Sequence, residues 1–244
     1  SRGSHQLFEA RYRPTMRIYC ALLIIATSIE VFADHGAQTW ENAHRSVVSV
    51  LPTWPGFQKP GHGAPRGTAP EGSGIAVNLS SLEESPYILT AAHVVDRATR
   101  VQIRESEAAP LLDAEVLWKD YDADIALLKT ENARRVFHLT AQSPKPGEHV
   151  CAIGNPFGLG VSMSCGVVSG PNRLDLGFNP IEDFIQTDAA VNPGASGGAL
   201  VNADGELLGM IAAIYTKEAD IDAGVNFAIS SELLIERMKQ FEIR

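Results

Sequence analysis

Short apolar runs, each only a few residues long and separated by polar, Gly or Pro residues, recur along most of this chain. Runs of this length and spacing are typical of the strands of a small barrel or sandwich. They fall into two series on either side of a segment that contains Pro144, Pro146 and Gly147, and each series is a candidate β half. The runs cover residues 46–50, 74–79, 87–90, 100–103, 115–117 and 125–129, then 148–153, 163–169, 183–186, 199–201, 207–214 and 225–229.

The boundaries of these halves follow from the segments between the runs. We predict an N-terminal β half over residues 38–138, a C-terminal β half over 139–230, and a helix over 231–244. Ser231 is the predicted cap of that helix, and Leu233, Leu234, Met238 and Phe241 form its apolar stripe. Residues 51–74 are dense in Pro and Gly, which predicts a long surface loop.

The first residues are typical of targeting rather than of a fold. A basic start at Met16 and Arg17, the apolar run 18–29 and a small-residue site before Asp34 predict a signal peptide over 16–33. The run of about 12 residues is short for a membrane anchor, which needs about 20. Residues 1–15 form an upstream segment that fits neither a signal peptide nor a core. We therefore expect a periplasmic or secreted protein without a stable membrane anchor.

Charge and cysteine content limit the ligands. A net charge of −9 argues against a nucleic-acid partner, which requires clustered Lys and Arg. Without the signal peptide the chain keeps two cysteines, Cys151 and Cys165, which either form one disulfide across a hairpin or stay reduced in the core. The sequence contains neither CxxC nor HExxH, so we predict no metal site.

The most informative motif is a serine among glycines, in Gly194-Ala195-Ser196-Gly197-Gly198. Glycine allows a sharp turn and a close approach of the backbone to a substrate carbonyl. The pattern also matches the nucleophile elbow of α/β-hydrolases, whose histidine follows the serine. The last histidine here is His149, upstream of Ser196, so the elbow interpretation fails.

Two upstream residues complete a candidate catalytic triad. His93 ends the apolar run 88–95, and Asp124 begins the run 125–129, where a carboxylate at the edge of a core could fix an imidazole. Asp120 and Asp122 are alternatives, but Asp124 adjoins the buried run. The chain order His, Asp, Ser is that of chymotrypsin, not that of subtilisin.

These motifs resemble the HtrA/Deg-type trypsin-like serine proteases. The similarity rests on TAAHVV, DADIALLK, GNPFGLG, QTDAAVNPGASGGAL and VNFAI, and spans residues 38–242. It implies an all-β chymotrypsin-like fold of two six-stranded Greek-key barrels with the active site between them. It also implies export, unfolded or peptide substrates and a quality-control role. Relatives commonly trimerise through aromatic residues, for which Trp40 and Trp54 are candidates.

The expected chemistry is acyl transfer without metal or cofactor. Ser196 would attack the scissile carbonyl, His93 would carry the proton and Asp124 would orient the imidazole. The predicted oxyanion hole lies on the segment Gly194, Ala195, Ser196, where the backbone N–H groups of Gly194 and Ser196 would be the donors. Each donor would stabilise the transition state by roughly 3 kcal/mol.

Two departures from the family pattern stand out. Ala195 stands where the family has Asn and where chymotrypsin has the Asp that pairs with a newly cut N-terminus. Activation by such an ion pair is therefore not expected. The sequence after the predicted helix leaves no room for the usual PDZ domain, so we expect a protease domain alone.

The predicted substrate pocket consists of Ala190, Ala212, Ala213 and Ile214. Ala190 replaces the Asp with which trypsin-like enzymes bind Lys or Arg, and Ile214 occupies a position kept as Gly in deep pockets. Small aliphatic P1 residues are the expected substrates. Two other functions stay open: a module that binds unfolded segments by strand addition without cutting them, and an esterase that shares the chemistry.

Overall fold

The computed structural model describes residues 35–64, 69–78, 87–131, 135–212 and 224–242. Residues from Gly36 onward form one unit. The predicted signal peptide and the segment before it lie outside the described residues. Among the helices that are described, none combines the length and the apolar character that a membrane crossing requires.

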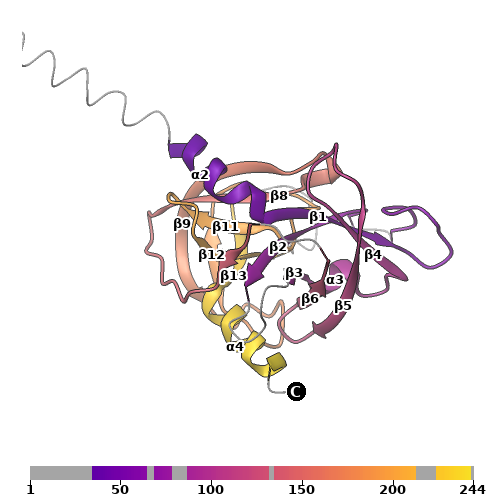
Figure 1. Ribbon diagram of the computed structural model, residues 1–244. Coiled ribbons are helices and arrows are strands. Elements are labelled where there is room, and N and C mark those ends of the chain that lie inside the picture. The colour runs from indigo at the N-terminus through magenta and orange to yellow at the C-terminus, as the bar shows by residue number, and fades with distance from the viewer. Residues whose placement is uncertain (1–34, 65–68, 79–86, 132–134, 213–223, 243–244) are drawn as a thin grey trace, which may run out of the picture. The chain divides into compact units, whose positions relative to one another are not determined.

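The first six strands close into a barrel (Figure 1). Their spatial order is β1-β4-β5-β6-β3-β2, and β1 also pairs with β2, so each strand has two antiparallel neighbours. A short seventh strand, β7, adds to β2 in parallel. The strands are β1 (Val47–Thr53), β2 (Gly72–Asn78), β3 (Tyr87–Ala91), β4 (Arg100–Arg104), β5 (Leu112–Asp120), β6 (Ile125–Lys129) and β7 (Phe137–His138).

The remaining six strands form a second closed barrel, in the order β10-β13-β12-β11-β8-β9. They are β8 (His149–Gly154), β9 (Ser162–Arg173), β10 (Phe184–Thr187), β11 (Ala199–Asn202), β12 (Leu207–Ile211) and β13 (Asn226–Ser230). Helix α4 (Ser231–Glu242) follows directly. The predicted all-β fold of two six-stranded barrels with a C-terminal helix is therefore confirmed.

Most of the barrel strands, though not β5 and β9, bury both of their faces, which explains why their apolar runs are nearly continuous. Side chains alternate between the faces of a strand. In β3, Ile88 belongs to a core cluster made only of first-barrel residues, whereas the adjacent Leu89 belongs to a cluster that also contains Ile153 and Met210 of the second barrel. One face thus fills the barrel and the other face packs against the second barrel.

Strand β1 extends further than predicted, through Leu51, Pro52 and Thr53 into the segment expected to be loop. Beyond Val50, β1 pairs with β4 but no longer with β2. Proline lacks an N–H group and is accepted where a strand has a free edge. Pro52 can therefore continue the strand, and its carbonyl accepts a hydrogen bond from Gly61 N–H at 2.9 Å.

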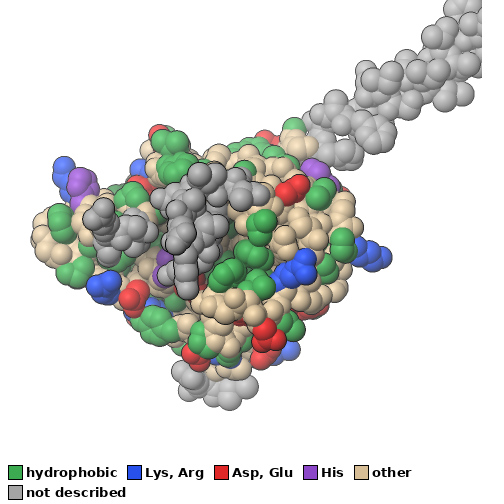
Figure 2. All heavy atoms as spheres, turned by 180° about the vertical axis from the view of Figure 1, so that it is seen from behind, with side chains coloured by type: hydrophobic (Ala, Val, Ile, Leu, Met, Phe, Trp, Pro, Cys, Tyr) green, Lys and Arg blue, Asp and Glu red, His purple; other side chains and the backbone are tan. Residues whose placement is uncertain are grey.

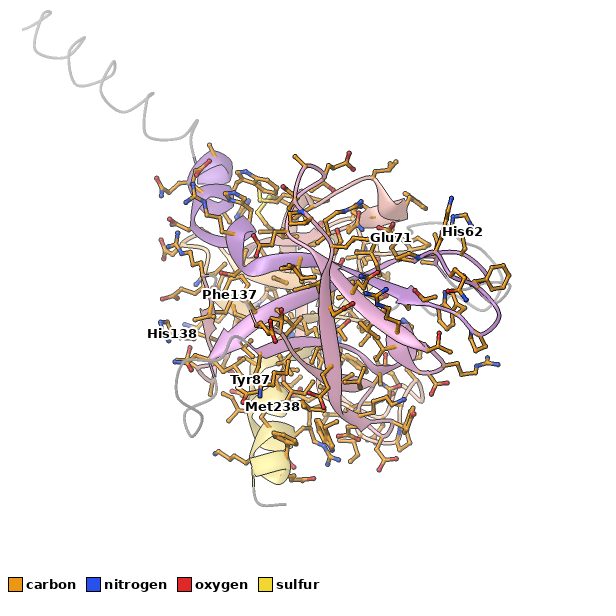
Figure 3. The ribbon with its side chains drawn as sticks, turned by 45° about the vertical axis from the view of Figure 1, so that its right-hand side comes forward. His62, Glu71, Tyr87, Phe137, His138 and Met238 are labelled. Carbon is orange, nitrogen blue, oxygen red and sulfur yellow. A yellow bond between two sulfur atoms is a disulfide. The ribbon has the colours of Figure 1, made fainter. Side chains whose placement is uncertain are left out.

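Helix α4 begins at Ser231, the residue predicted to cap it, and the cap is one residue earlier, at Ser230. The hydroxyl of Ser230, not of Ser231, accepts the Leu233 N–H at 3.1 Å, while Ser231 Oγ accepts the Gln142 N–H at 3.0 Å. The predicted apolar stripe packs inward, and Met238 points toward Tyr87 of β3 (Figure 3). An ion pair between Arg237 and Asp120, both largely buried, also ties the helix to the end of β5.

Charged side chains of both signs are interspersed on the surface shown in Figure 2. One exposed pair joins β4 to β5, where Arg100 Nη2 lies 2.7 Å from an Asp113 carboxylate oxygen. The hydrogen bond from Arg100 lowers the pKa of Asp113. Neither residue is buried, so this pair is a convenient control for the charged pairs nearer to the site.

Candidate active site

His93 lies just past the end of β3. The sequence suggested a strand end for this residue, but β3 stops at Ala91 and a short helix, α3 (Ala92–Val95), carries His93. The turn is fixed because the Ala92 N–H donates to the Asp124 carbonyl at 3.2 Å. The histidine side chain is 40% exposed, so its ring can reach a substrate.

Asp124 holds His93 through two hydrogen bonds. Its Oδ2 lies 2.7 Å from His93 Nδ1, and its Oδ1 accepts the His93 backbone N–H at 2.9 Å. An ionised carboxylate only accepts hydrogen bonds, so Nδ1 carries the proton and Nε2 is left as the acceptor. This is the tautomer that can remove a proton from a hydroxyl.

The two alternative acids occupy other positions. Asp120 binds Arg237 and accepts the Asp122 N–H at 3.0 Å, while the Asp122 side chain is exposed. Asp124 is the one of the three that is hydrogen-bonded to His93. Its φ of 56° places it in the left-handed region, which Asp tolerates better than most residues but which still costs of order 1 kcal/mol.

Ser196 lies in the loop 192–198, between β10 and β11, and this loop is held against the first barrel. The Ser196 carbonyl accepts the Ser73 N–H of β2 at 2.9 Å. A Cβ on Gly197 would lie 2.2 Å from the Ser73 carbonyl oxygen and 3.1 Å from Ala91 N. The backbone next to Ser196 therefore contacts the end of the strand that leads into His93.

Three successive carbonyl groups of this loop are anchored. The Pro193 carbonyl accepts the Phe157 N–H at 2.7 Å, the Gly194 carbonyl accepts the Ser73 hydroxyl at 2.7 Å, and the Ala195 carbonyl accepts the Gly198 N–H at 2.9 Å. In a trans peptide the N–H group points opposite to the carbonyl group. The N–H groups of Gly194 and Ser196 are consequently directed away from the anchors at Pro193 and Ala195.

The N–H groups of the segment Gly194, Ala195, Ser196 are not equivalent. Ala195 N–H donates to the Asn192 carbonyl at 3.0 Å, so it is already satisfied. For Gly194 N–H and Ser196 N–H, the described part of the chain offers no hydrogen-bond acceptor. Two unpaired donors beside a serine are the arrangement that an oxyanion hole requires.

A cavity of about 170 Å³ lies beneath this loop. Its lining includes Ala190, Asn192 and Ala195 from the segment between β10 and β11, together with Met163 and Ser164 of β9. Of the predicted pocket residues, Ala190 contributes to this cavity. Ala212 is buried and does not line it, and Ala213 and Ile214 lie outside the described residues.

The two cysteines face each other across β8 and β9. Cys151 and Cys165 are directly paired in register, and their sulfur atoms are joined as a disulfide, with the Cα atoms 4.0 Å apart. His149 lies close to both sulfur atoms. Because metals bind the thiolate form of cysteine, a disulfide leaves this cluster without its sulfur ligands.

Sequence reasoning missed Ser73 and Asn155, which hold the loop in place. Both are fully buried. Asn155 N–H donates to Ser73 Oγ at 2.7 Å, and Ser73 Oγ donates to the Gly194 carbonyl. The available signal was a small polar residue between two glycines at the start of a strand, in Gly72-Ser73-Gly74. Such a residue has room to form hydrogen bonds with a neighbouring backbone.

Comparison with known proteins identifies the family. The model of the trypsin-like peptidase domain matches residues 72–210. The periplasmic serine endoprotease DegP of Escherichia coli K12 is 39% identical over 166 residues, which are 67% of this chain and 34% of DegP. The periplasmic pH-dependent serine endoprotease DegQ of the same organism is 34% identical over 213 residues, 86% of this chain and 44% of DegQ.

Solved structures of HtrA-type proteases are similar to this chain as well. The HtrA-type protease AlgW with a tripeptide superposes with a TM-score of 0.69 at 32% identity, over 83% of this chain and 62% of AlgW. A serine endoprotease from Yersinia pestis gives a TM-score of 0.65 at 28% identity, over 84% of this chain and 65% of that protein. The chain spans less than half the length of DegP and DegQ. It belongs to the trypsin-like peptidase family, and its relatives there are the HtrA and Deg serine endoproteases.

Proposed function

We propose that this chain is a serine endopeptidase in which His93, Asp124 and Ser196 form the catalytic triad. The observation that carries the proposal is the pair of hydrogen bonds from His93 to Asp124. They leave the imidazole with a free Nε2 acceptor on the barrel edge that contacts the Ser196 loop. Neither a binding module nor a structural protein requires that arrangement.

The reaction proceeds in two halves. Ser196 Oγ forms a bond to the scissile carbonyl carbon while its proton passes to His93 Nε2. The oxyanion binds to the N–H groups of Gly194 and Ser196, and collapse of the intermediate breaks the C–N bond as His93 gives the proton to the leaving amine. Water then attacks the acyl-enzyme by the same proton transfers and restores Ser196.

The proposed substrates are unfolded or peptide segments, cut after small aliphatic P1 residues. Ala190 supplies no carboxylate for a basic side chain. The relatives are named as periplasmic endoproteases, which supports a quality-control role in the periplasm. We also propose that export depends on the signal peptide over 16–33 and that the protein assembles as a homotrimer, as the family resemblance implies.

Cleavage of reduced casein tests this function. The wild-type chain is expected to degrade casein, whereas Ser196→Ala removes the nucleophile and is expected to lower kcat by about 10⁶-fold. The new carboxyl termini, identified by mass spectrometry, should be Ala, Val or other small aliphatic residues. Failure of the folded wild-type chain to cleave casein or peptides would favour a binding module, and basic P1 residues would contradict the proposed pocket.

A further inference from the structure

Glu71 is a largely buried carboxylate that the proposed mechanism does not use. It directly precedes β2, and its side chain is 17% exposed. Its Oε2 accepts a hydrogen bond from Asn155 Nδ2 at 2.8 Å and lies 3.6 Å from Arg104 Nη2. Figure 3 shows Glu71 at the base of the loop whose outer part carries His62. Moving a charge out of water is costly unless the charge is paired. Asn155 and Arg104 are the partners that offset the cost of burying the Glu71 carboxylate.

Asn155 transmits this contact into the loop 155–160, which includes the short helix η3 (Pro156–Gly158). Every hydrogen-bonding group of Asn155 takes part. Its Oδ1 accepts the Gly160 N–H at 2.7 Å and its carbonyl accepts the Gly158 N–H at 3.3 Å, while its N–H is bound to Ser73. The Nδ2 bond to Glu71 fixes which way the amide faces, because a flipped amide would place its oxygen against the carboxylate.

The loop 155–160 in turn sets the position of an oxyanion-hole donor. Phe157 N–H donates to the Pro193 carbonyl at 2.7 Å, which orients the peptide that carries Gly194 N–H. Phe157 has a φ of 58°, an unfavourable conformation for an aromatic residue that persists only where the surroundings enforce it. The Phe157 side chain is 56% exposed, so its packing contributes little to holding this conformation. The backbone hydrogen bonds of Asn155 on the same loop therefore contribute much of the constraint.

We propose that Glu71, with Arg104 as its counter-ion, is a positioning residue for the oxyanion hole. It acts through Asn155 and the 155–160 loop on the Gly194 N–H and does not touch the reacting atoms. The inference rests on the proposed peptidase function. A hydrogen bond to an ionised carboxylate is about twice as strong as a neutral one, which gives a reason for a charge at this position.

The test compares Glu71→Ala and Glu71→Gln with the matched control Asp113→Ala, which breaks the exposed ion pair with Arg100. A short peptide p-nitroanilide with a small aliphatic P1 residue is the substrate. We expect Glu71→Ala to lower kcat by about tenfold to a hundredfold, less than the loss of a whole oxyanion donor, with KM within about twofold. Gln keeps an acceptor for Asn155 but removes the charge, so Glu71→Gln should retain more of kcat than Glu71→Ala and less than wild type, and Asp113→Ala should equal wild type.

A second readout separates positioning from general destabilisation. A peptide boronate, which binds as a tetrahedral adduct, should lose affinity in Glu71→Ala by the same factor as kcat. Should that variant not fold, Arg104→Met, which removes the counter-ion but keeps the Glu71 carboxylate, is expected to lower kcat by about threefold to tenfold at unchanged KM.

The two possible failures differ. A folded wild-type chain that neither hydrolyses peptides nor binds the boronate would overturn the proposed function and this inference with it. A wild-type chain that hydrolyses peptides, beside a folded Glu71→Ala whose kcat and boronate affinity match those of Asp113→Ala, would overturn only the role of Glu71. If Arg104→Met is used in place of Glu71→Ala, a kcat and a boronate affinity equal to those of Asp113→Ala would likewise overturn only the role of Glu71.

Discussion

Asp124→Asn is expected to lower kcat for peptide hydrolysis by about 10⁴-fold. The Asp124 carboxylate accepts two hydrogen bonds, one from His93 Nδ1 at 2.7 Å and one from the His93 N–H at 2.9 Å. An amide has only one oxygen. If that oxygen keeps the backbone N–H, the NH₂ group faces Nδ1 and forces the ring proton onto Nε2, where it blocks removal of the serine proton.

The control for this prediction is Asp122→Asn, an exposed acid two residues earlier in the same turn. Steady-state kinetics with one peptide substrate, together with thermal unfolding of each variant, provide the comparison. Asp122→Asn should match wild type in kcat. A loss below about tenfold in folded Asp124→Asn, or an equal loss in Asp122→Asn, would show that Asp124 does not orient the catalytic histidine.

Gly194→Ala is expected to lower kcat by about 10² to 10³-fold, the effect of losing one oxyanion-hole donor. A Cβ at this position would lie 2.5 Å from the Asn155 carbonyl oxygen and 3.0 Å from Phe157 N, both of them backbone atoms. Gly194 also has a φ of 98°, which alanine rarely adopts. The loop must shift to admit the methyl group, and the Gly194 N–H shifts with it.

Gly147→Ala is the matched control, because Gly147 has a φ of 85° but open space where an alanine methyl group would lie. Both variants carry the conformational cost of a left-handed alanine, of order 1 kcal/mol, and only Gly194→Ala adds a clash. Thermal unfolding should show a stability loss in both variants, larger in Gly194→Ala because of the added clash, while kinetics should show a loss of kcat in Gly194→Ala alone. Equal kcat in the two variants would show that the Gly194 N–H is not an oxyanion-hole donor.

The strand pattern was readable from the sequence because most strands, β5 and β9 excepted, bury side chains on both faces. The run 125–129 coincides with β6, and the two series of runs became the two barrels. The prediction was less accurate for the ends of elements, where a single residue decides the boundary or the cap. The cap of α4 is Ser230 and not Ser231, because the Leu233 N–H donates to the Ser230 hydroxyl. The sequence could not distinguish the two, since adjacent serines offer the same group.

The pairing of His93 with Asp124 could be predicted from residue types and chain order, but the residues that hold the Ser196 loop could not. His93 and Asp124 border two strands that are paired neighbours, β3 and β6, so their apolar runs were enough to predict this pairing. By contrast, the bond from Ser73 to the Gly194 carbonyl joins residues 121 positions apart, and the bond from Asn155 to Ser73 spans 82 positions. Neither residue belongs to a motif that predicts this role, so only the closed barrels reveal that they hold the Ser196 loop.

The most direct test of the account is labelling of the folded chain by a fluorophosphonate, read by peptide mapping. This reagent reacts with a serine that is activated by a neighbouring base. The account predicts one adduct per chain, on Ser196, absent from Ser196→Ala and from urea-unfolded wild type, and greatly slowed in His93→Ala. Absence of labelling in folded wild-type protein, or labelling at a rate that His93→Ala does not change, would contradict a catalytic triad at this site.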